Sequence, residues 1–210
     1  MKSISVKQAL SIVFKQFEFK GLWQAAFGQP ETAGFWYLGG AEKNGKTTFA
    51  MMLAKYLTGF GKVLYVSAEE GFSKDIIAAM VAAGLSDTDK NFKLLDYMPW
   101  DELNQKFESR KCPKIIFIDN TTVYRDEITR KMVLELKEKH KNKLIIFVSH
   151  EEKGLPDSAL GNIWRKLSKI IIQAEGLKAI ISGRCPGGTI HINEEKANLY
   201  WGTTIQNQEQ

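Results

Sequence analysis

Short runs of apolar residues alternate with helical patterns along most of this chain. The runs are Phe35–Leu38, Val63–Val66, Ile115–Ile118 and Leu144–Ser149, and the helical patterns that follow or separate them cover about Lys46–Leu57, Ser73–Ala83 and Asp126–His140. Most of the runs are apolar at consecutive positions, which is typical of strands buried on both faces. Strands of this kind joined by helices predict an α/β fold in which a mostly parallel sheet lies between helices.

In the C-terminal part the apolar runs are closer together, without helical patterns between them. After Leu160 come four closely spaced runs, which are Ile170–Gln173, Leu177–Ser182, Thr189–Asn193 and Leu199–Trp201. Glu175–Gly176 and Pro186–Gly188 between them are typical turn residues. We therefore expect antiparallel C-terminal strands that extend the sheet.

Composition favours one globular domain. The chain has 210 residues, of which 44% are hydrophobic and 25% charged, and a domain of this size buries roughly 70% of its unfolded surface. No repeat or linker divides it, so we expect one domain over residues 1–205, with 1–34 as an N-terminal helical cover and 206–210 as a frayed tail. The apolar runs fall far short of the roughly 20 residues of a membrane-spanning helix, and no signal peptide is apparent. Two isolated cysteines argue against disulfides or structural zinc, so a cytoplasmic location is expected.

An octapeptide directly after the first apolar run fits the pattern Gly-x-x-x-x-Gly-Lys-Thr and opens a predicted helix. This strand-loop-helix setting is the one in which backbone amides and a helix N-terminus bind phosphate. Lys46 would reach the β- and γ-phosphates and the Thr47 hydroxyl would ligate Mg²⁺, so we expect ATP and Mg²⁺ as ligands. Thr48 is either a further phosphate donor or only a helix residue. The octapeptide consists of Gly40, Ala41, Glu42, Lys43, Asn44, Gly45, Lys46 and Thr47.

Polar residues end the other apolar runs. Asp119 follows Ile115–Ile118 and is the expected second anchor for Mg²⁺, but Asn120 stands where many P-loop ATPases have a catalytic glutamate. Glu69 and Glu70 follow another run and are candidates for the base that orients water. His150 follows the fourth run and is a candidate sensor of the γ-phosphate. Parallel strands bring all these ends to one edge of the sheet.

Four stretches together resemble the RecA-like ATPases: the octapeptide, Leu64–Glu70, Ile116–Asp119 and Val148–Gly154. Within that group they are most similar to RadA-type recombination ATPases, and the whole looks like the minimal single-domain RecA-like proteins of phages. The similarity runs from about Phe35 to Trp201.

The resemblance implies roles for single residues. It makes Glu69 the residue that activates the attacking water, with Glu70 as the reserve, and it makes His150 the link to a DNA-binding loop at Glu151–Arg165. Trp164, Arg165 and Lys166 would then contact single-stranded DNA, although packing of the tryptophan is an equal alternative. Arg184 is the candidate for a cation that acts in trans on a neighbouring copy.

These observations predict a Mg²⁺-dependent RecA-like ATPase that forms homo-oligomers and acts on single-stranded DNA in recombination, repair or phage replication. The net charge of +5 fits a polyanionic partner, although the charge alone favours the simpler interpretation of a mildly basic soluble surface. One alternative is a nucleotide-gated interaction module, such as a helicase loader with a replication or recombination partner. A small-molecule phosphotransferase is the other.

Overall fold

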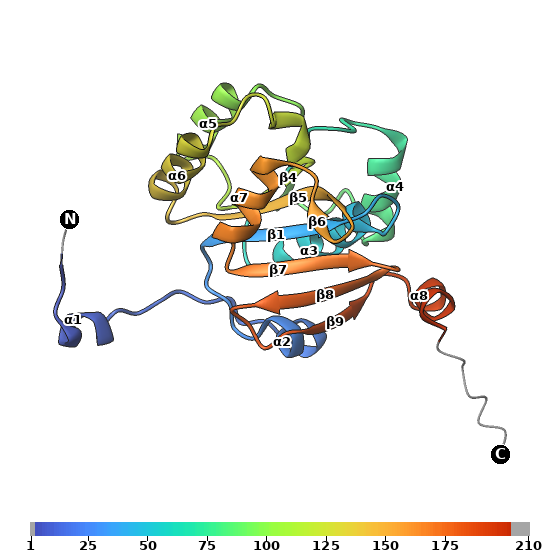
Figure 1. The fold of residues 1–210 in the computed structure, drawn as a ribbon, viewed down its shortest axis with the longest axis horizontal. Helices are drawn as coiled ribbons and strands as arrows, with labels where there is room; N and C mark the ends of the chain where they lie inside the picture. Colours follow the sequence, from blue (N-terminus) through green and yellow to red (C-terminus); the bar gives the residue numbers. More distant parts are fainter. Residues whose placement is uncertain (1–2, 203–210) are drawn as a thin grey trace, which may run out of the picture.

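Within residues 3–202, the part of the chain that the computed structural model describes, a sheet of nine strands lies between two layers of helices (Figure 1). The strand order is β3-β2-β4-β5-β1-β7-β8-β9, and β6 pairs with β5 alone. The strands are β1 Gly34–Gly40, β2 Val63–Ser67, β3 Phe92–Asp96, β4 Ile115–Asp119, β5 Leu144–Glu152, β6 Leu155–Pro156, β7 Ile170–Glu175, β8 Lys178–Gly183 and β9 Gly188–His191.

The sheet is parallel from β3 to β7, and β8 and β9 continue it in antiparallel pairing. The predicted α/β class, the mostly parallel sheet and the antiparallel strands in the C-terminal part are therefore confirmed.

Alternate residues of each central strand enter two separate hydrophobic cores. In β1, Trp36 and Leu38 face one core, whereas Phe35 and Tyr37 face the other. The first core is covered by α2 Gly21–Phe27, α3 Lys46–Leu57 and α4 Lys74–Ala82, and the second by α5 Trp100–Glu108, the 3-10 helix η1 Thr121–Tyr124, α6 Arg130–Lys139 and α7 Ala159–Leu167. Burial on both faces explains why these strands read as unbroken apolar runs.

The two ends of the described chain lie outside these layers. Helix α1 Val6–Leu10 has no buried residue and extends from the body at one end, and α8 Glu194–Trp201 lies at the other end (Figure 1). Between α1 and α2, Phe17 and Phe19 enter the first core. A membrane-crossing helix would have to be longer and more apolar than any in residues 3–202.

The strand register brings the loops that carry the candidate site residues to one edge of the sheet. Gly40 at the end of β1 is level with His150 in β5, and Ser67 at the end of β2 is level with Asp119 in β4. Ligands of open parallel sheets bind in the crevice outside these carboxyl ends. The order β2-β4-β5-β1 therefore sets four candidate segments side by side.

The prediction of a strand at Leu199–Trp201 is wrong, because these residues end helix α8. The helix begins at Asn193, whose side chain accepts a hydrogen bond from the Lys196 backbone N–H, with Glu194 and Glu195 in the first turn. These are ordinary start signals for a helix. The predicted frayed tail at 206–210 lies outside the described residues.

Strand β3 and helix α5 were not predicted. In β3, Lys93 and Asp96 are exposed and the apolar residues are only half-buried, because the strand is at the edge of the sheet. A short strand with this mixture has no clear apolar run. Helix α5 buries Trp100, Leu103 and Phe107 at helical spacing, which was the available signal.

Candidate functional site

The loop Gly40–Thr47, called the P-loop from here on, connects β1 to α3. Gly45 is the N-cap of α3 and has a φ of 87°, in the left-handed region that favours glycine. Gly40 allows a close approach, since an added Cβ would lie 2.3 Å from the Ala174 carbonyl oxygen. The two glycines let the chain turn tightly, so that the N-terminus of α3 opens at the sheet edge.

A side-chain contact fixes the P-loop to the next turn of the sheet. The Gly176 backbone N–H between β7 and β8 donates a hydrogen bond of 2.7 Å to Asn44 Oδ1. A Cβ on Gly45 would lie 3.0 Å from the Leu177 side chain of the same turn. Asn44 therefore anchors the loop, a role that the sequence pattern does not reveal because 132 residues separate the two partners.

Lys46 is buried at the start of α3, and its ammonium donates a hydrogen bond of 2.8 Å to the Ala41 carbonyl oxygen of the same loop. Burial lowers the pKa of this ammonium, while the nearby carboxylates of Asp119 and Glu69 act in the opposite direction. The lysine thus points across the P-loop toward the acidic residues of the neighbouring strands.

Asp119 ends β4 beneath the P-loop and is buried. Its carboxylate accepts a hydrogen bond of 2.5 Å from the Tyr65 hydroxyl and another from the Thr47 hydroxyl. Burial raises the pKa of Asp119 to about 6, and the two hydroxyl groups oppose that shift. Tyr65 was not predicted as a site residue, although a tyrosine inside an otherwise apolar strand was a signal.

Glu69 lies beside the ends of β4 and β5. Its Oε2 accepts a hydrogen bond of 3.1 Å from Asn120 Nδ2 and lies 3.4 Å from His150 Nε2. Half of the Glu69 side chain is exposed, so it faces the open side of the crevice. In the sequence, Asn120 was notable only because a glutamate is common at its position. In the structure its side chain positions the Glu69 carboxylate.

Glu70 is the other candidate from the same segment. It is exposed and accepts a hydrogen bond of 3.3 Å from the Ser73 hydroxyl. Its charge acts on Asp119, as does that of Glu69, but only Glu69 also acts on Lys46. The geometry therefore favours Glu69 over Glu70 as the carboxylate that faces the P-loop lysine.

The residues present fit a magnesium nucleotide. Within residues 3–202 no group of three or more His, Cys, Asp or Glu side chains is arranged to hold a metal ion by itself. Mg²⁺ needs no such group, because one or two protein oxygens, phosphate oxygens and water complete its shell. Asp119 and Thr47, in hydrogen-bond contact with each other beside the P-loop, supply two suitable protein oxygens.

A second buried carboxylate lies in β5, the strand that pairs with β1 and so adjoins the P-loop strand. Glu151 in β5 has no exposed side-chain surface, accepts a hydrogen bond from Gln173 Nε2 and lies 3.7 Å from Arg165 Nη1. A Cβ on Gly39 would lie 2.3 Å from Glu151 Oε1, so the glycine leaves room for this carboxylate. Gln173 was missed, although a polar residue near the end of a strand beside β1 was a signal.

The predicted DNA-binding loop Glu151–Arg165 is instead regular structure. Residues 151–156 form the tight hairpin of β5 and β6, with Lys153 and Gly154 at its turn, and α7 follows.

Trp164 is fully buried and stacks on Phe147 with 3.9 Å between ring centroids. The prediction that Trp164 stacks on DNA bases is therefore wrong, because the ring belongs to the core. Lys166 is exposed, and Arg165 contacts Glu151 and the Gly154 carbonyl oxygen.

Arg184 is exposed and follows β8 at the opposite edge of the sheet from the P-loop. Gly183 pairs with Ile170, the first residue of β7, whereas the P-loop follows the last residue of β1. Arg184 is thus remote from the P-loop of its own chain, and a role there would require a neighbouring copy.

Comparison with known proteins supports the fold. No protein-family model matches the chain, and no curated protein has significant sequence similarity to it. Flagellar accessory protein FlaH from Methanocaldococcus jannaschii superposes with a TM-score of 0.60 at 18% identity, covering 84% of this chain and 91% of FlaH. The ATPase domain of G40P superposes with a TM-score of 0.54 at 17% identity, covering 76% of this chain and 80% of that domain. The chain has the fold of the RecA-like P-loop ATPases.

Proposed function

We propose that this protein binds ATP with Mg²⁺ and hydrolyses it. The observation that carries the proposal is the convergence of Lys46, Thr47, Asp119 and Glu69 at one sheet edge, from segments that follow three different strands. Each supplies one of the groups that phosphoryl transfer needs: a cation, a hydroxyl and a carboxylate for the metal, and a base for water.

Each residue has a separate task in the proposed reaction. The P-loop amides and Lys46 hold the β- and γ-phosphates, and bound Mg²⁺ neutralises phosphate charge. Glu69 accepts a proton from the water that attacks the γ-phosphorus, as the bond between that phosphorus and the oxygen bridging to ADP breaks. Asn120 and His150 hold the Glu69 carboxylate in place, and Glu70 is the alternative base.

His150 also connects the crevice to the β5–β6 hairpin. Its ring contacts Glu69, and its own carbonyl oxygen accepts a hydrogen bond from the Asp157 backbone N–H after β6. We propose that the γ-phosphate shifts His150 and, through it, the hairpin. In this proposal His150 remains the sensor of the γ-phosphate, but it acts on the short β5–β6 hairpin and not on a long loop.

We extend the proposal to the polymer on which the ATPase acts, single-stranded DNA in recombination, repair or phage replication. A surface rich in cations without an ion-pair partner, described in the next subsection, supports a polyanionic partner, and so does the net charge of +5. A homo-oligomer in which Arg184 acts on the nucleotide of a neighbour completes this proposal, and ATP and two free cysteines suit a cytoplasmic location. The alternative is an interaction module that ATP switches without DNA.

Phosphate release from ATP tests these proposals. We expect Mg²⁺-dependent turnover by the wild-type chain and none by Lys46→Ala, with Lys90→Ala, an exposed lysine outside the P-loop, as the control. Turnover that rises with oligo(dT) supports the action on DNA. Turnover that ignores oligo(dT) favours the interaction module, and no turnover or nucleotide binding under any condition overturns the ATPase.

A further inference from the structure

A basic groove lies at the sheet edge opposite the P-loop. Its cavity volume is about 970 Å³, and it lies between residues 13–17 and the segments that lead into β2, β4 and β5. Seven cationic side chains line it, against Glu31 as the acidic side chain there among the described residues. Six of these cations are Lys15, Lys62, Lys93, Arg110, Lys111 and Lys114. We call this surface the basic groove.

The cations of the basic groove are available to a ligand. All six are exposed, and none of them takes part in an ion pair with another residue of the described range 3–202. The seventh, Lys141, lies 2.6 Å from Glu138, and Glu31 is itself neutralised by Lys169 at 2.7 Å. The groove therefore presents almost uncompensated positive charge, which attracts a polyanion.

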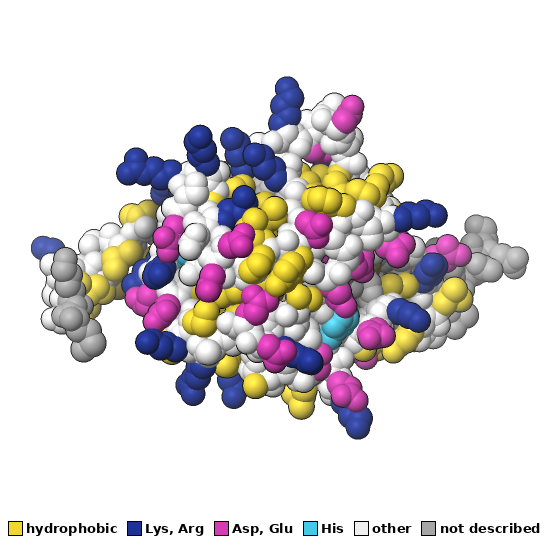
Figure 2. Space-filling model, turned by 90° about the horizontal axis from the view of Figure 1, so that it is seen from above, with side chains coloured by type: hydrophobic (Ala, Val, Ile, Leu, Met, Phe, Trp, Pro, Cys, Tyr) yellow, Lys and Arg dark blue, Asp and Glu magenta, His cyan; other side chains and the backbone are white. Residues whose placement is uncertain are grey.

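The distribution of charge over the surface agrees with this description. Figure 2 shows Lys and Arg side chains gathered toward the left of the molecule, the side on which the parallel strands begin in Figure 1. Acidic side chains are more frequent toward the middle and right of the same view. On the face that Figure 2 draws, the cations are therefore unevenly distributed.

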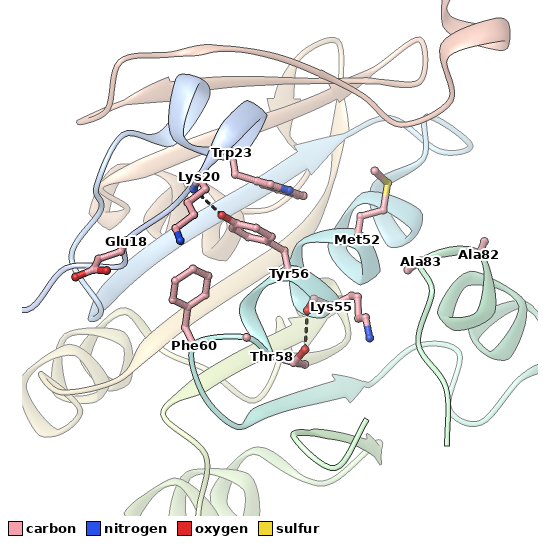
Figure 3. Close-up of a pocket in the computed structure, with 11 residues that line it drawn as sticks. Glu18, Lys20, Trp23, Met52, Lys55, Tyr56, Thr58, Phe60, Ala82 and Ala83 are labelled. Atoms are coloured by element: carbon pink, nitrogen blue, oxygen red, sulfur yellow. Dashed lines mark hydrogen bonds between the residues drawn. The ribbon is translucent and has the colours of Figure 1, made fainter. Parts of the chain in front are cut away.

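Aromatic rings lie among these cations. Phe14 is 59% exposed and Phe60 is 39% exposed, and both line the basic groove. Phe60 also lines an adjoining hollow of about 900 Å³. There Trp23 and Tyr56 stack with 4.7 Å between ring centroids, and Lys20 lies at the rim (Figure 3). The cation-rich groove and the aromatic hollow adjoin each other. Together they have the two components of a single-strand binding surface, which are cations that bind phosphates and rings on which bases stack.

We propose that the basic groove binds the phosphate backbone of single-stranded nucleic acid, with bases stacked on Phe14 and Phe60. The inference deepens the proposed action on DNA and rests on it, but it is independent of ATP hydrolysis. It places the polymer at the amino-terminal edge of the sheet, away from both the nucleotide crevice and the α7 region that the sequence suggested. Duplex DNA fits less well, because its bases are paired and cannot stack on protein rings.

Fluorescence anisotropy with labelled oligo(dT) tests the location. The full chain carrying Lys62→Ala, Lys111→Ala and Lys114→Ala is compared with a control that carries Lys74→Ala, Lys131→Ala and Lys196→Ala. Both variants lose three exposed lysines, so their net charges are equal. We expect the groove variant to bind at least tenfold more weakly at low salt. Its plot of log affinity against log salt should be flatter by about 2, at roughly 0.7 for each lost phosphate contact.

Substitution of Phe14 tests the contribution of ring stacking to oligo(dT) binding separately from that of charge. Phe14→Ala should weaken binding by about fivefold or more without changing the salt slope, and Phe14→Trp should restore it, because stacking rather than charge is altered. ATP turnover without DNA should be the same in all these variants, since none touches the crevice.

The outcomes separate the two proposals. Equal loss of affinity in the groove and control variants overturns the location while leaving action on DNA standing. Absence of oligo(dT) binding by the wild-type chain even at low salt overturns both. Binding to phosphatidylserine vesicles without binding to oligo(dT) also overturns both, because the polyanion would then be a membrane surface.

Discussion

The side chains of Glu69 and His150 meet across β4, with 3.4 Å between Glu69 Oε2 and His150 Nε2. Glu69 follows β2 and His150 lies in β5, and these two strands are not neighbours in the sheet. The strand between them contributes Asn120, whose amide donates to the same Glu69 oxygen. Three strand ends thus hold one carboxylate, and that arrangement distinguishes Glu69 from its exposed neighbour Glu70.

Removal of the P-loop lysine should abolish nucleotide binding or turnover. In Lys46→Ala the cation that is proposed to hold the phosphates is lost, whereas the apolar face of α3 is unchanged, so the domain should stay folded. Phosphate release and ATP binding by calorimetry measure the effect, and far-UV circular dichroism checks the fold. A folded variant with wild-type affinity and turnover would remove the basis of the P-loop assignment.

Loss of the proposed base should leave binding intact. Glu69→Gln keeps the size of the side chain but cannot accept the proton, so turnover should fall by about 10²-fold or more while ATP and Mg²⁺ affinities stay near wild type. Glu70→Gln should be milder, because Glu70 lacks the contacts with His150 and Asn120. Steady-state and single-turnover kinetics give the comparison. The reverse order of effects would assign the base to Glu70.

The sequence predicted the turn from β1 through Gly40–Thr47 into α3 because the geometry of that turn is local. The spacing of Gly40, Gly45 and Lys46, between a strand and a helix, is enough to specify the turn. The contact between Tyr65 and Asp119 joins residues 54 positions apart and depends on the register of β2 with β4. No short pattern encodes that register, so contacts of this kind emerged only in three dimensions.

The prediction that Trp164 contacts DNA overlooked the face of α7 on which this residue lies, which is the buried one. Trp164 lies four residues after Leu160, and both are buried, so helical spacing already favoured packing. The adjoining cations Arg165 and Lys166 suggested a binding surface instead. The basic groove gave no motif at all, because its cations come from segments that only the fold brings together.

Replacement of the buried tryptophan should affect stability rather than DNA binding. Trp164→Ala removes a fully buried ring stacked on Phe147 and should lower the free energy of unfolding by about 3–5 kcal/mol. Trp164→Phe keeps most of the packing and should cost less. Denaturant unfolding measures both variants. Arg165→Ala with Lys166→Ala should leave oligo(dT) affinity within about twofold, and a large loss there would return the DNA contact to α7.

The buried carboxylate that is proposed to hold Mg²⁺ should destabilise the ligand-free protein at neutral pH. Burial raises the pKa of Asp119 from 3.8 to about 6, so the folded state disfavours the ionised form relative to the unfolded state. That cost is fully present above about pH 6 and disappears as the pH falls below 3.8, where the carboxyl group is neutral in both states. Asp119→Asn removes the charge but keeps an oxygen that accepts from the Tyr65 hydroxyl.

We therefore expect Asp119→Asn to abolish Mg²⁺-dependent turnover and yet to be more stable than wild type. The raised pKa of Asp119 corresponds to a difference in stability of about 3 kcal/mol at pH 8. This difference between the two proteins should shrink toward zero between about pH 6 and pH 4. Urea unfolding of both proteins without nucleotide, at several pH values in this range, measures it. Tyr65→Phe is the control, since loss of the opposing hydroxyl should raise the pKa of Asp119 further and move the transition to higher pH. A variant less stable than wild type at pH 8 would mean that Asp119 is ionised without penalty, held by its hydroxyl partners.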